Sequence, residues 1–413
     1  MKKGSAMRHK WLFLLILLLS ITFLGGCWSR KEMTDLAFVT GVGIDKAKAK
    51  NEYRLTLQVV NPGNFASIQQ SGGGSGSGPP VAIFSATGQN IIEASRRNTL
   101  GMSRELYYAH TNLLVIGEEL AREKGIYDIL DAFERDAEFR DTATVVIAKG
   151  TTAENMIKTL TPVDKIPATR LIKVLENTEK SLGENMSVDI DGVIGALVST
   201  GKEPIISGFS VIGNKRLADK QESLQASKPG ALLVADSMGI IRNGKLIHWI
   251  SRETARGVLW IQGKVKGSSI NIDWQDKKKA IAIEAMREKT NIKANIKRGK
   301  PFISVYLKVE GRVGETDVPI DLKDPNEIEK MERLWDKEIE KEVIEAIKMA
   351  QQQKSDIFGF GDIIHDSYPD LWKNLEYNWD KTNFPKLAVD VSVKTSIRHT
   401  GLRNKSFLTK IKH

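Results

Sequence analysis

The sequence predicts an α+β protein of several domains, with mixed or antiparallel sheets that are each flanked by helices. Three observations support this fold class. Strand-like and helix-like segments alternate between residues 81 and 200. An antiparallel hairpin is indicated over residues 292–309, where apolar side chains occupy every second position. A long amphipathic helix is indicated over residues 325–353, where apolar side chains recur three or four positions apart.

The first element is a leader peptide rather than part of the fold. Residues 1–10 carry four basic and no acidic side chains, and the 14 residues from Trp11 to Leu24 are apolar except for Ser20 and Thr22. This order of charged, apolar and small residues is typical of a cleaved secretory signal. It ends at Leu24, Gly25, Gly26 and Cys27, which resembles a bacterial lipobox. The sole cysteine of the chain therefore becomes the predicted site of diacylglycerol attachment and N-acylation.

A transmembrane anchor is the alternative interpretation of this segment. A membrane-spanning helix needs about 20 consecutive apolar residues, and the run here stops at two glycines. Two acyl chains hold a protein stably at ~0.8 kcal/mol per buried methylene, whereas one chain gives marginal binding. We therefore expect residues 1–26 to be removed and the remainder to lie outside the cytoplasm, held by lipid.

The remaining composition is that of an ordinary globular protein. About 387 residues follow the leader, which is enough for two or three domains. With its only thiol acylated, the chain has none left for a disulfide. The net charge is +10 for the whole sequence and about +6 without the four basic residues of the leader. This mild excess suits an anionic membrane surface, and because the chain is expected outside the membrane, we predict no nucleic-acid partner.

The elements up to residue 200 follow in order. Residues 36–44 and 53–59 have strand patterns, the second strictly alternating. The Gly and Ser run at residues 71–78 predicts a flexible loop, since no Gly-Lys-Ser/Thr follows to make a phosphate-binding loop. The later segments are strands 81–86, 111–116 and 142–148, with helices 90–100, 118–135, 168–182 and 191–200 between and after them. Residues 151–154 fit a capping box that opens a helix to residue 160.

A change in character near Pro204 places a domain boundary near residue 200. Beyond it we expect strands 205–212 and 231–235, a short helix 251–259, and the hairpin 292–309. Asp324 and Pro325 then provide a helix N-cap and a first helical residue, and the long helix runs to about Gln353. The final strand covers residues 387–397.

A search for catalytic or metal sites yields only weak candidates. The six histidines are far apart and show no metal-ligand spacing. Ser103, Glu105 and His110 cluster in sequence, but they are more simply explained as a helix end that enters a strand. Asp189 and Asp191 resemble a turn or helix cap more than a paired carboxylate site. We predict no catalytic residue, no metal and no cofactor.

One basic stretch has two open interpretations. Residues 271–300 contain nine Lys or Arg against four Asp or Glu. Their alternation indicates a solvated sheet face, and the same charges would suit anionic lipid headgroups. The sequence does not orient this face.

Several segments together resemble the C subunit of nutrient germinant receptors, the GerAC-type spore germination lipoproteins. Their order and spacing span nearly the whole chain after the leader. Ser29 stands where many members carry an acidic residue, and the 71–78 loop is a local feature. The matching segments are residues 27–32, 35–45, 103–106 with 110–111 and 113–119, 208–209 with 211, 253–257 with 259–260, 356–361, 368–369, Trp372, Trp379 and 398–401.

The resemblance implies a non-catalytic scaffold or signalling subunit of a receptor complex needed for spore germination. Family members are lipid-anchored at the outer face of the spore's inner membrane and act with two integral-membrane subunits. The implied organisation is a germination-protein domain over residues 27–200 and a second over 201–413. Since the family's C subunit has three domains, the second part is expected to divide near residue 265.

Two other functions remain as alternatives. A solute-binding lipoprotein of a membrane transporter would share the anchor and the size, but usually has two lobes built on parallel sheets, unlike the hairpin of residues 292–309. A membrane-anchored hydrolase would need chemistry at His110. Neither the nutrient sensed nor the partner surface is indicated by the sequence.

Overall fold

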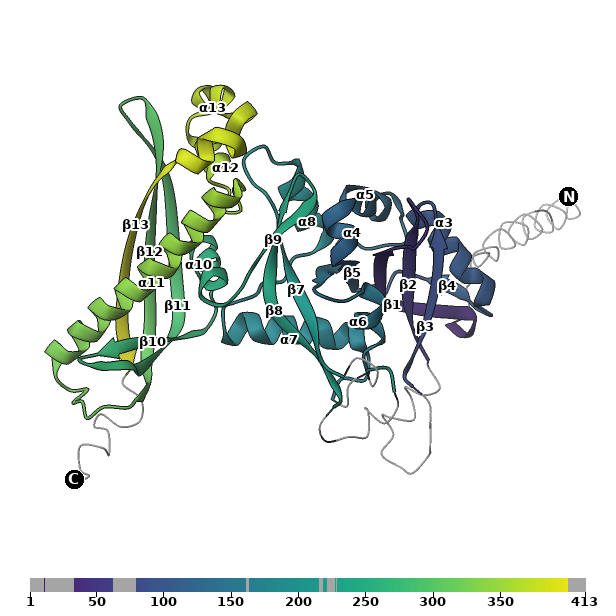
Figure 1. Ribbon diagram of the computed structural model, residues 1–413, viewed down its shortest axis with the longest axis horizontal. Helices are drawn as coiled ribbons and strands as arrows, with labels where there is room; N and C mark the ends of the chain where they lie inside the picture. Colours follow the sequence, from purple (N-terminus) through teal and green to yellow (C-terminus); the bar gives the residue numbers. More distant parts are fainter. Residues whose placement is uncertain are drawn as a thin grey trace, which may run out of the picture.

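Two β-sheets with flanking helices follow one another along the long axis of the molecule (Figure 1). The computed structural model describes residue 11 and residues 33–61, 79–160, 163–214, 218–220, 227 and 229–399. This mixed α+β architecture confirms the predicted fold class. The leader, with Leu24, Gly25, Gly26 and Cys27, lies outside the described residues, as does the 71–78 loop.

The first sheet has nine strands and is mixed. Its main path runs β3-β2-β1-β5-β6-β7-β8-β9, and β4 pairs with β1. The pairs from β1 through β5 and β6 to β7 are parallel, whereas the strands on either side pair antiparallel. The strands are β1 Leu36–Lys46, β2 Tyr53–Val60, β3 Val81–Gly88, β4 Glu105–Tyr107, β5 Leu113–Gly117, β6 Thr144–Ala148, β7 Ile205–Gly213, β8 Ala231–Arg242 and β9 Lys245–Ile250.

Helices cover both faces of this sheet because its central strands are apolar on both sides. In β5, Leu114 and Ile116 join the core that includes residues of α3, α4, α5 and α8, while Leu113 and Val115 join the core under α6 and α7. This is the continuous apolar pattern expected of buried parallel strands. The helices are α3 Ile91–Arg97, α4 Glu118–Glu123, α5 Tyr127–Arg135, α6 Ala153–Lys158, α7 Pro167–Ser181 and α8 Ile190–Val198.

Two predicted helices differ in detail from the structure. The helix expected over residues 118–135 is split into α4 and α5 at Gly125, whose φ of +92° no ordinary side chain adopts readily and whose Cβ position lies 2.7 Å from the Gly244 carbonyl oxygen. The cap of α6 is Thr152, which accepts from the Asn155 N–H, rather than a box formed by Thr151 and Glu154. Buried Asp45 accepts the N–H groups of Ala153 and Glu154 instead.

The second sheet has four strands in the order β10-β11-β12-β13. The predicted hairpin is present and longer than expected, because β11 pairs antiparallel with β12 from Ile281 opposite Thr316 to Lys297 opposite Lys300. The last strand pairs parallel with β12. The strands are β10 Ser268–Trp274, β11 Lys277–Lys297, β12 Lys300–Thr316 and β13 Ala388–His399.

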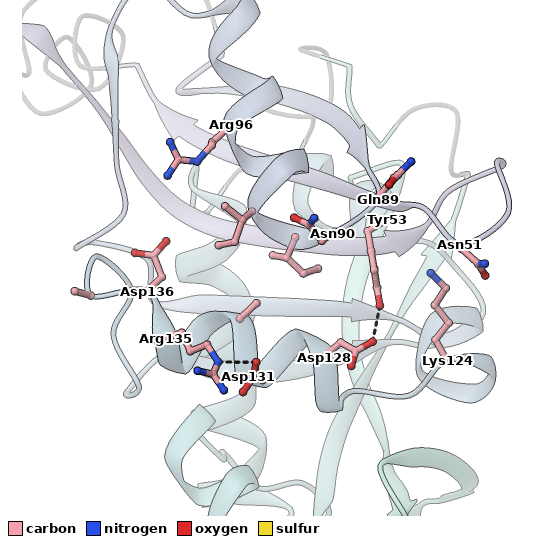
Figure 2. A pocket seen from close by; sticks show the side chains of 14 residues that line it. Asn51, Tyr53, Gln89, Asn90, Arg96, Lys124, Asp128, Asp131, Arg135 and Asp136 are labelled. Atoms are coloured by element: carbon pink, nitrogen blue, oxygen red, sulfur yellow. Dashed lines mark hydrogen bonds and ion pairs between the residues drawn. The ribbon is translucent and has the colours of Figure 1, made fainter.

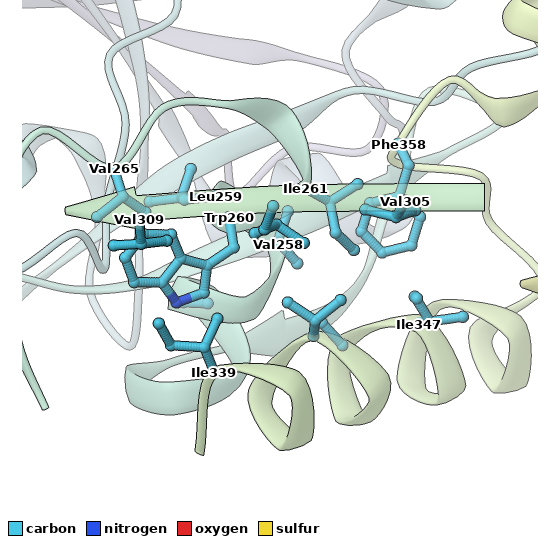
Figure 3. Packing of buried hydrophobic residues seen from close by; sticks show 14 of the residues in the cluster. Val258, Leu259, Trp260, Ile261, Val265, Val305, Val309, Ile339, Ile347 and Phe358 are labelled. Atoms are coloured by element: carbon cyan, nitrogen blue, oxygen red, sulfur yellow. The ribbon is translucent and has the colours of Figure 1, made fainter. Parts of the chain in front are cut away.

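One face of the second sheet is buried by two helices. The long helix α11 (Pro325–Gln353) is capped by Asp324 as predicted and packs against β13 and β10. The shorter α10 (Arg252–Gln262) packs against α11 and contacts β11 and β12. Figure 3 shows Leu259 and Trp260 of α10 among Val305 and Val309 of β12 and Ile339 of α11. The short helices α12 (Phe360–Ser367) and α13 (Pro369–Leu375) precede β13.

The predicted domain limits fall at different places relative to the sheets. The β6–β7 pairing joins residues 147–148 to residues 208–209, so the first sheet continues across the limit expected near residue 200. The division expected near residue 265 lies between α10 and β10, where the second sheet begins. A division into domains at these residues stays a prediction.

No helix in the described part of the chain combines the length and the apolar character needed to cross a membrane.

Candidate functional site: a polar pocket and the junction between the sheets

A polar pocket of about 860 Å³ opens between α3 and α5 (Figure 2). The start of β2 contributes Tyr53, α3 contributes Arg96, and the end of α4 contributes Lys124. Three aspartates line its α5 side, two from the helix itself and Asp136 from its C-cap. The helical spacing of Asp128, Asp131 and Arg135 places these side chains on the pocket side of α5.

Tyr53 contacts two charged side chains of this pocket. Its hydroxyl donates to Asp128 Oδ2 over 3.0 Å, and Lys124 Nζ lies 4.0 Å from the centre of its ring. Burial and the adjacent carboxylate raise the pKa of Tyr53 to about 12, so the phenol stays neutral and donates at physiological pH. Nearby, Arg135 Nε donates to Asp131 over 2.9 Å. The pocket therefore offers both charge signs, which suits a small polar molecule.

A second site is built at the junction between the two sheets. Asp356 is fully buried and accepts from the backbone N–H groups of residues 358–361 at 2.8–3.2 Å. It also accepts from Trp379 Nε1 over 2.9 Å. The carboxylate thus occupies the N-terminus of α12, where orphan N–H groups and the helix dipole favour negative charge. Burial raises the pKa of Asp356 to about 7, against the lowering effect of the hydrogen bonds from Gly361, Trp379 and Phe360.

This junction ties the second sheet's helices to the first sheet. The Glu203 N–H donates to the Asp356 carbonyl oxygen over 2.8 Å, and Ser199 Oγ donates to Asp362 over 2.6 Å. Arg242, at the end of β8, donates to the Gln353 carbonyl oxygen over 2.6 Å. A Cβ at Gly201 would lie 2.4 Å from the Asp362 nitrogen, so only glycine permits this approach.

Several acidic groups meet at this junction. Burial raises the pKa of Glu203 to about 7 and also raises the pKa of Asp380, which accepts the Asp356 N–H over 3.2 Å. Arg242 lowers both values in part. A smaller cavity of about 420 Å³ lies beside them, lined by Arg242, Asn243, Lys354, Glu376, Tyr377, Trp379, Asp380 and Lys381.

A buried ion pair joins α10 to α11. Arg256 and Glu342 are 7% and 5% exposed, and the guanidinium contacts the carboxylate through both Nε, at 2.9 Å, and Nη2. Trp260 Nε1 donates to the same carboxylate over 3.1 Å. Gly257 lies at the closest approach of the two helices, where a Cβ would be 2.2 Å from the Glu342 carbonyl oxygen.

Comparison with known proteins gives the family of this chain. A model described as "Spore germination protein N-terminal domain" matches residues 29–211, and one described as "Spore germination B3/ GerAC like, C-terminal" matches residues 236–401. Spore germination protein KC of Bacillus subtilis is 40% identical, over 96% of this chain and 98% of that protein. The chain belongs to the GerAC family of spore germination proteins.

More distant relatives have the same extent. Spore germination protein B3 of Bacillus subtilis is 26% identical over 86% of this chain and 89% of its own length, and spore germination protein GerQC of Bacillus cereus is 23% identical over 94% and 99%. The crystal structure of the GerBC protein matches the fold with a TM-score of 0.51 and 20% identity, covering 88% of this chain and 98% of that one.

Within this GerAC-family fold, the weak candidates from the sequence have structural roles. Ser103 lies in a bend after a short 3-10 helix, Glu105 begins β4, and the His110 ring packs against Phe38 and Tyr107. Asp189 caps α8 by accepting the Gly192 N–H over 2.9 Å, as the cap interpretation predicted. Asp191 follows in the first turn of the same helix.

The expected absence of a metal and the predicted lipidation site both stay predictions. Among the described residues, no group of three or more His, Cys, Asp and Glu side chains could hold a metal ion. Cys27 and the lipobox before it lie outside these residues, so the lipidation of Cys27 stays a prediction.

Sequence reasoning missed the two features with the most convergent polar groups. The pocket is formed by side chains from four separate segments, and none of its residues belongs to a recognisable motif. The 356–361 segment matched the family, but its role depends on Trp379, which is 23 residues further along. The only sequence signal for this second site was Asp356, which stands just before a segment of alternating Phe and Gly at residues 358–361.

Proposed function

We propose that this chain is the lipid-anchored, non-catalytic subunit of a nutrient germinant receptor. Its support is the 40% identity to spore germination protein KC across 96% of the chain, together with two family models that cover both sheets. In this proposal the chain works with two integral-membrane subunits at the inner membrane of the spore. Its part is to scaffold or signal within that complex.

The proposed attachment is a diacylglycerol thioether on Cys27 with an acyl group on its amine. The sole thiol stands at the end of a lipobox, directly after the apolar segment of the leader. The first described element begins six residues later, at Met33. Two acyl chains hold a protein stably at the outer face of a bilayer. The proposed domains are residues 27–200 and 201–413, with a further division near residue 265.

The test is the release of dipicolinic acid from spores that lack this gene, exposed to amino acids, sugars and nucleosides in turn. Loss of the response to one nutrient set, with germination by dodecylamine intact, is the expected result. If every nutrient response is unchanged, the deletion is repeated in spores that lack other receptors of this kind. An unchanged response there contradicts the proposal.

The attachment is tested separately by Cys27→Ala. We expect a folded protein that is lost from the membrane fraction and a slower nutrient response, because the variant carries neither the diacylglycerol thioether nor the N-acyl group. Normal membrane fractionation of the variant, with no fatty-acid labelling of the unaltered protein, would contradict the anchor alone and leave the receptor role open.

A further inference from the structure

Three lysines stand directly opposite one another across the open face of the second sheet. Lys289 of β11 is the register partner of Lys308 of β12, and Lys308 is the register partner of Lys394 of β13. All three side chains are exposed. We call this set the lysine row. Neighbouring strands are 4.7–4.9 Å apart, so the row holds three positive charges within about 10 Å.

Within the described residues, the charge of the lysine row is only partly offset, since Glu310, two positions from Lys308 on the same face of β12, interacts electrostatically with Lys308. None of its members has an ion-pair partner there, whereas nearby Glu310 is held by Arg398 over 2.8 Å. Asp390 is the nearest carboxylate on the same face of β13, four positions before Lys394. Only two acidic residues of the chain, Glu32 and Glu222, lie outside the described part. Like charges directly opposite in a sheet destabilise the fold, so this arrangement calls for another cause.

The surroundings of the row are also basic. Arg287 and Lys293 flank Lys289 on the same face of β11, and both are exposed. The exposed ring of Tyr306 lies beside the row on β12. The sequence after β13, residues 400–413, adds four Lys or Arg and no Asp or Glu. The opposite face of the sheet is closed by α10 and α11, so only the lysine face is open to a partner.

We propose that the lysine row docks this sheet onto the anionic phospholipid headgroups of the membrane that carries the protein. The inference rests on the proposed lipid anchor, which keeps the chain beside a bilayer at all times. Lysines on three adjacent strands and the exposed ring of Tyr306 suit an anionic headgroup layer, because lysine is attracted to such a surface and tyrosine is enriched at membrane interfaces. Each lysine near such a surface strengthens binding about fivefold.

The experiment uses the acylated protein reconstituted in vesicles, with a fluorophore on a single introduced thiol. Tyr306→Cys places the label beside the row, and Glu345→Cys places it on the exposed side of α11, away from the sheet. Vesicles contain phosphatidylcholine alone or with about 30% phosphatidylglycerol, and a headgroup-linked quencher reports proximity. On the anionic vesicles at low salt, we expect several-fold stronger quenching at position 306 than at position 345.

Two triple variants decide whether the row is responsible. Replacing Lys289, Lys308 and Lys394 by Gln should reduce the docked population on the order of 100-fold and abolish the difference between labels. The matched control replaces exposed Lys48 and Lys50, in the turn between β1 and β2, and exposed Lys245 of β9 by Gln. It makes the same change in charge and should leave the difference between the labels intact. High salt should abolish it in every form.

Three results would overturn the proposal. The first is equal quenching at positions 306 and 345, and the second is quenching at position 306 that persists in the lysine-row variant. The third is that neither label is quenched while the lysine-row variant no longer binds the integral-membrane subunits. The last result would assign the face to an acidic protein segment. Absence of the lipid anchor is recognised separately. The protein without an introduced cysteine would then react with the fluorophore at Cys27, because its thiol would be free.

Discussion

Replacing Arg256 by Met should weaken the fold more than any surface change, because it leaves a buried carboxylate without its cation. Glu342 is 5% exposed and would retain only the Trp260 N–H, at 3.1 Å. Removal of one partner from such a pair typically costs ~3–5 kcal/mol in the free energy of unfolding. We expect a loss of about 4 kcal/mol, measured by urea denaturation of the mature protein with circular dichroism.

The double variant Arg256→Met with Glu342→Leu is the matched control. It removes both charges, so the main remaining cost is the unpaired Trp260 N–H, at ~1–3 kcal/mol. The double variant should therefore be more stable than Arg256→Met alone, with a coupling of roughly 3 kcal/mol between the sites. Additive losses, or a loss below about 1 kcal/mol for Arg256→Met, would refute a desolvated pair.

The pH dependence of Arg256→Met gives an independent check. Burial raises the pKa of Glu342, and loss of the guanidinium removes the strongest opposing influence. A carboxyl group whose pKa is raised on folding stabilises the folded state below its unfolded pKa and loses that contribution as pH rises through the folded pKa. The variant should consequently lose less stability at about pH 5 than at about pH 8.

Three further predictions concern single side chains. Gly257→Ala should lower the free energy of unfolding by about 1–3 kcal/mol, because the new Cβ would lie 2.2 Å from the α11 backbone. Gly195→Ala in α8 is the control and should be neutral or stabilising, since its Cβ would meet nothing within 4 Å. Equal urea midpoints for the two variants would contradict the close approach at Gly257. Burial raises the pKa of Glu288 to about 8, so the unaltered protein should lose stability as the pH rises from 4.5 through about 8. Glu288→Gln should remove this pH dependence, whereas Glu315→Gln should keep it. Parallel pH profiles of the melting temperature for the two variants would exclude this role. Tyr53→Phe should lose about 0.5–1.5 kcal/mol with its hydrogen bond to Asp128, and an unchanged unfolding midpoint would show that the bond adds nothing.

Much of the fold was predictable because most strands keep a regular pattern. β11 shows where the pattern fails: it begins at Lys277, well before the predicted start at residue 292. A bulge between Ala285 and Arg287 shifts the alternation, and Glu288 then points into the buried face, where its carboxylate accepts the Val265 N–H over 2.7 Å. In the sequence, a glutamate at an inward position breaks the apolar alternation and so indicates a loop rather than a strand. Its burial depends on tertiary partners such as the Val265 N–H, which the sequence pattern does not show.

The polar sites could not be predicted for a different reason. Tyr53 and Asp128 are 75 residues apart, and Asp356 and Trp379 are 23 residues apart, so only the finished fold brings these pairs together. The family match pointed to residues 253–260 and 356–361 without giving their partners. In the structure, Arg256 pairs with Glu342 on α11, and Asp356 accepts N–H groups at the N-terminus of α12.

The parallel pairing of β12 with β13 has a kinetic consequence. These neighbours in the sheet are separated in sequence by α11, α12 and α13, and β13 is the last described strand. Pairing of strands so far apart in sequence has a large entropic cost of loop closure, and this cost precedes the stabilising contacts. The pairing is therefore expected to form slowly. Until β13 arrives, the edge of β12 stays open to pairing with other chains. A chain exported through a membrane would complete this sheet only after its C-terminal part had crossed.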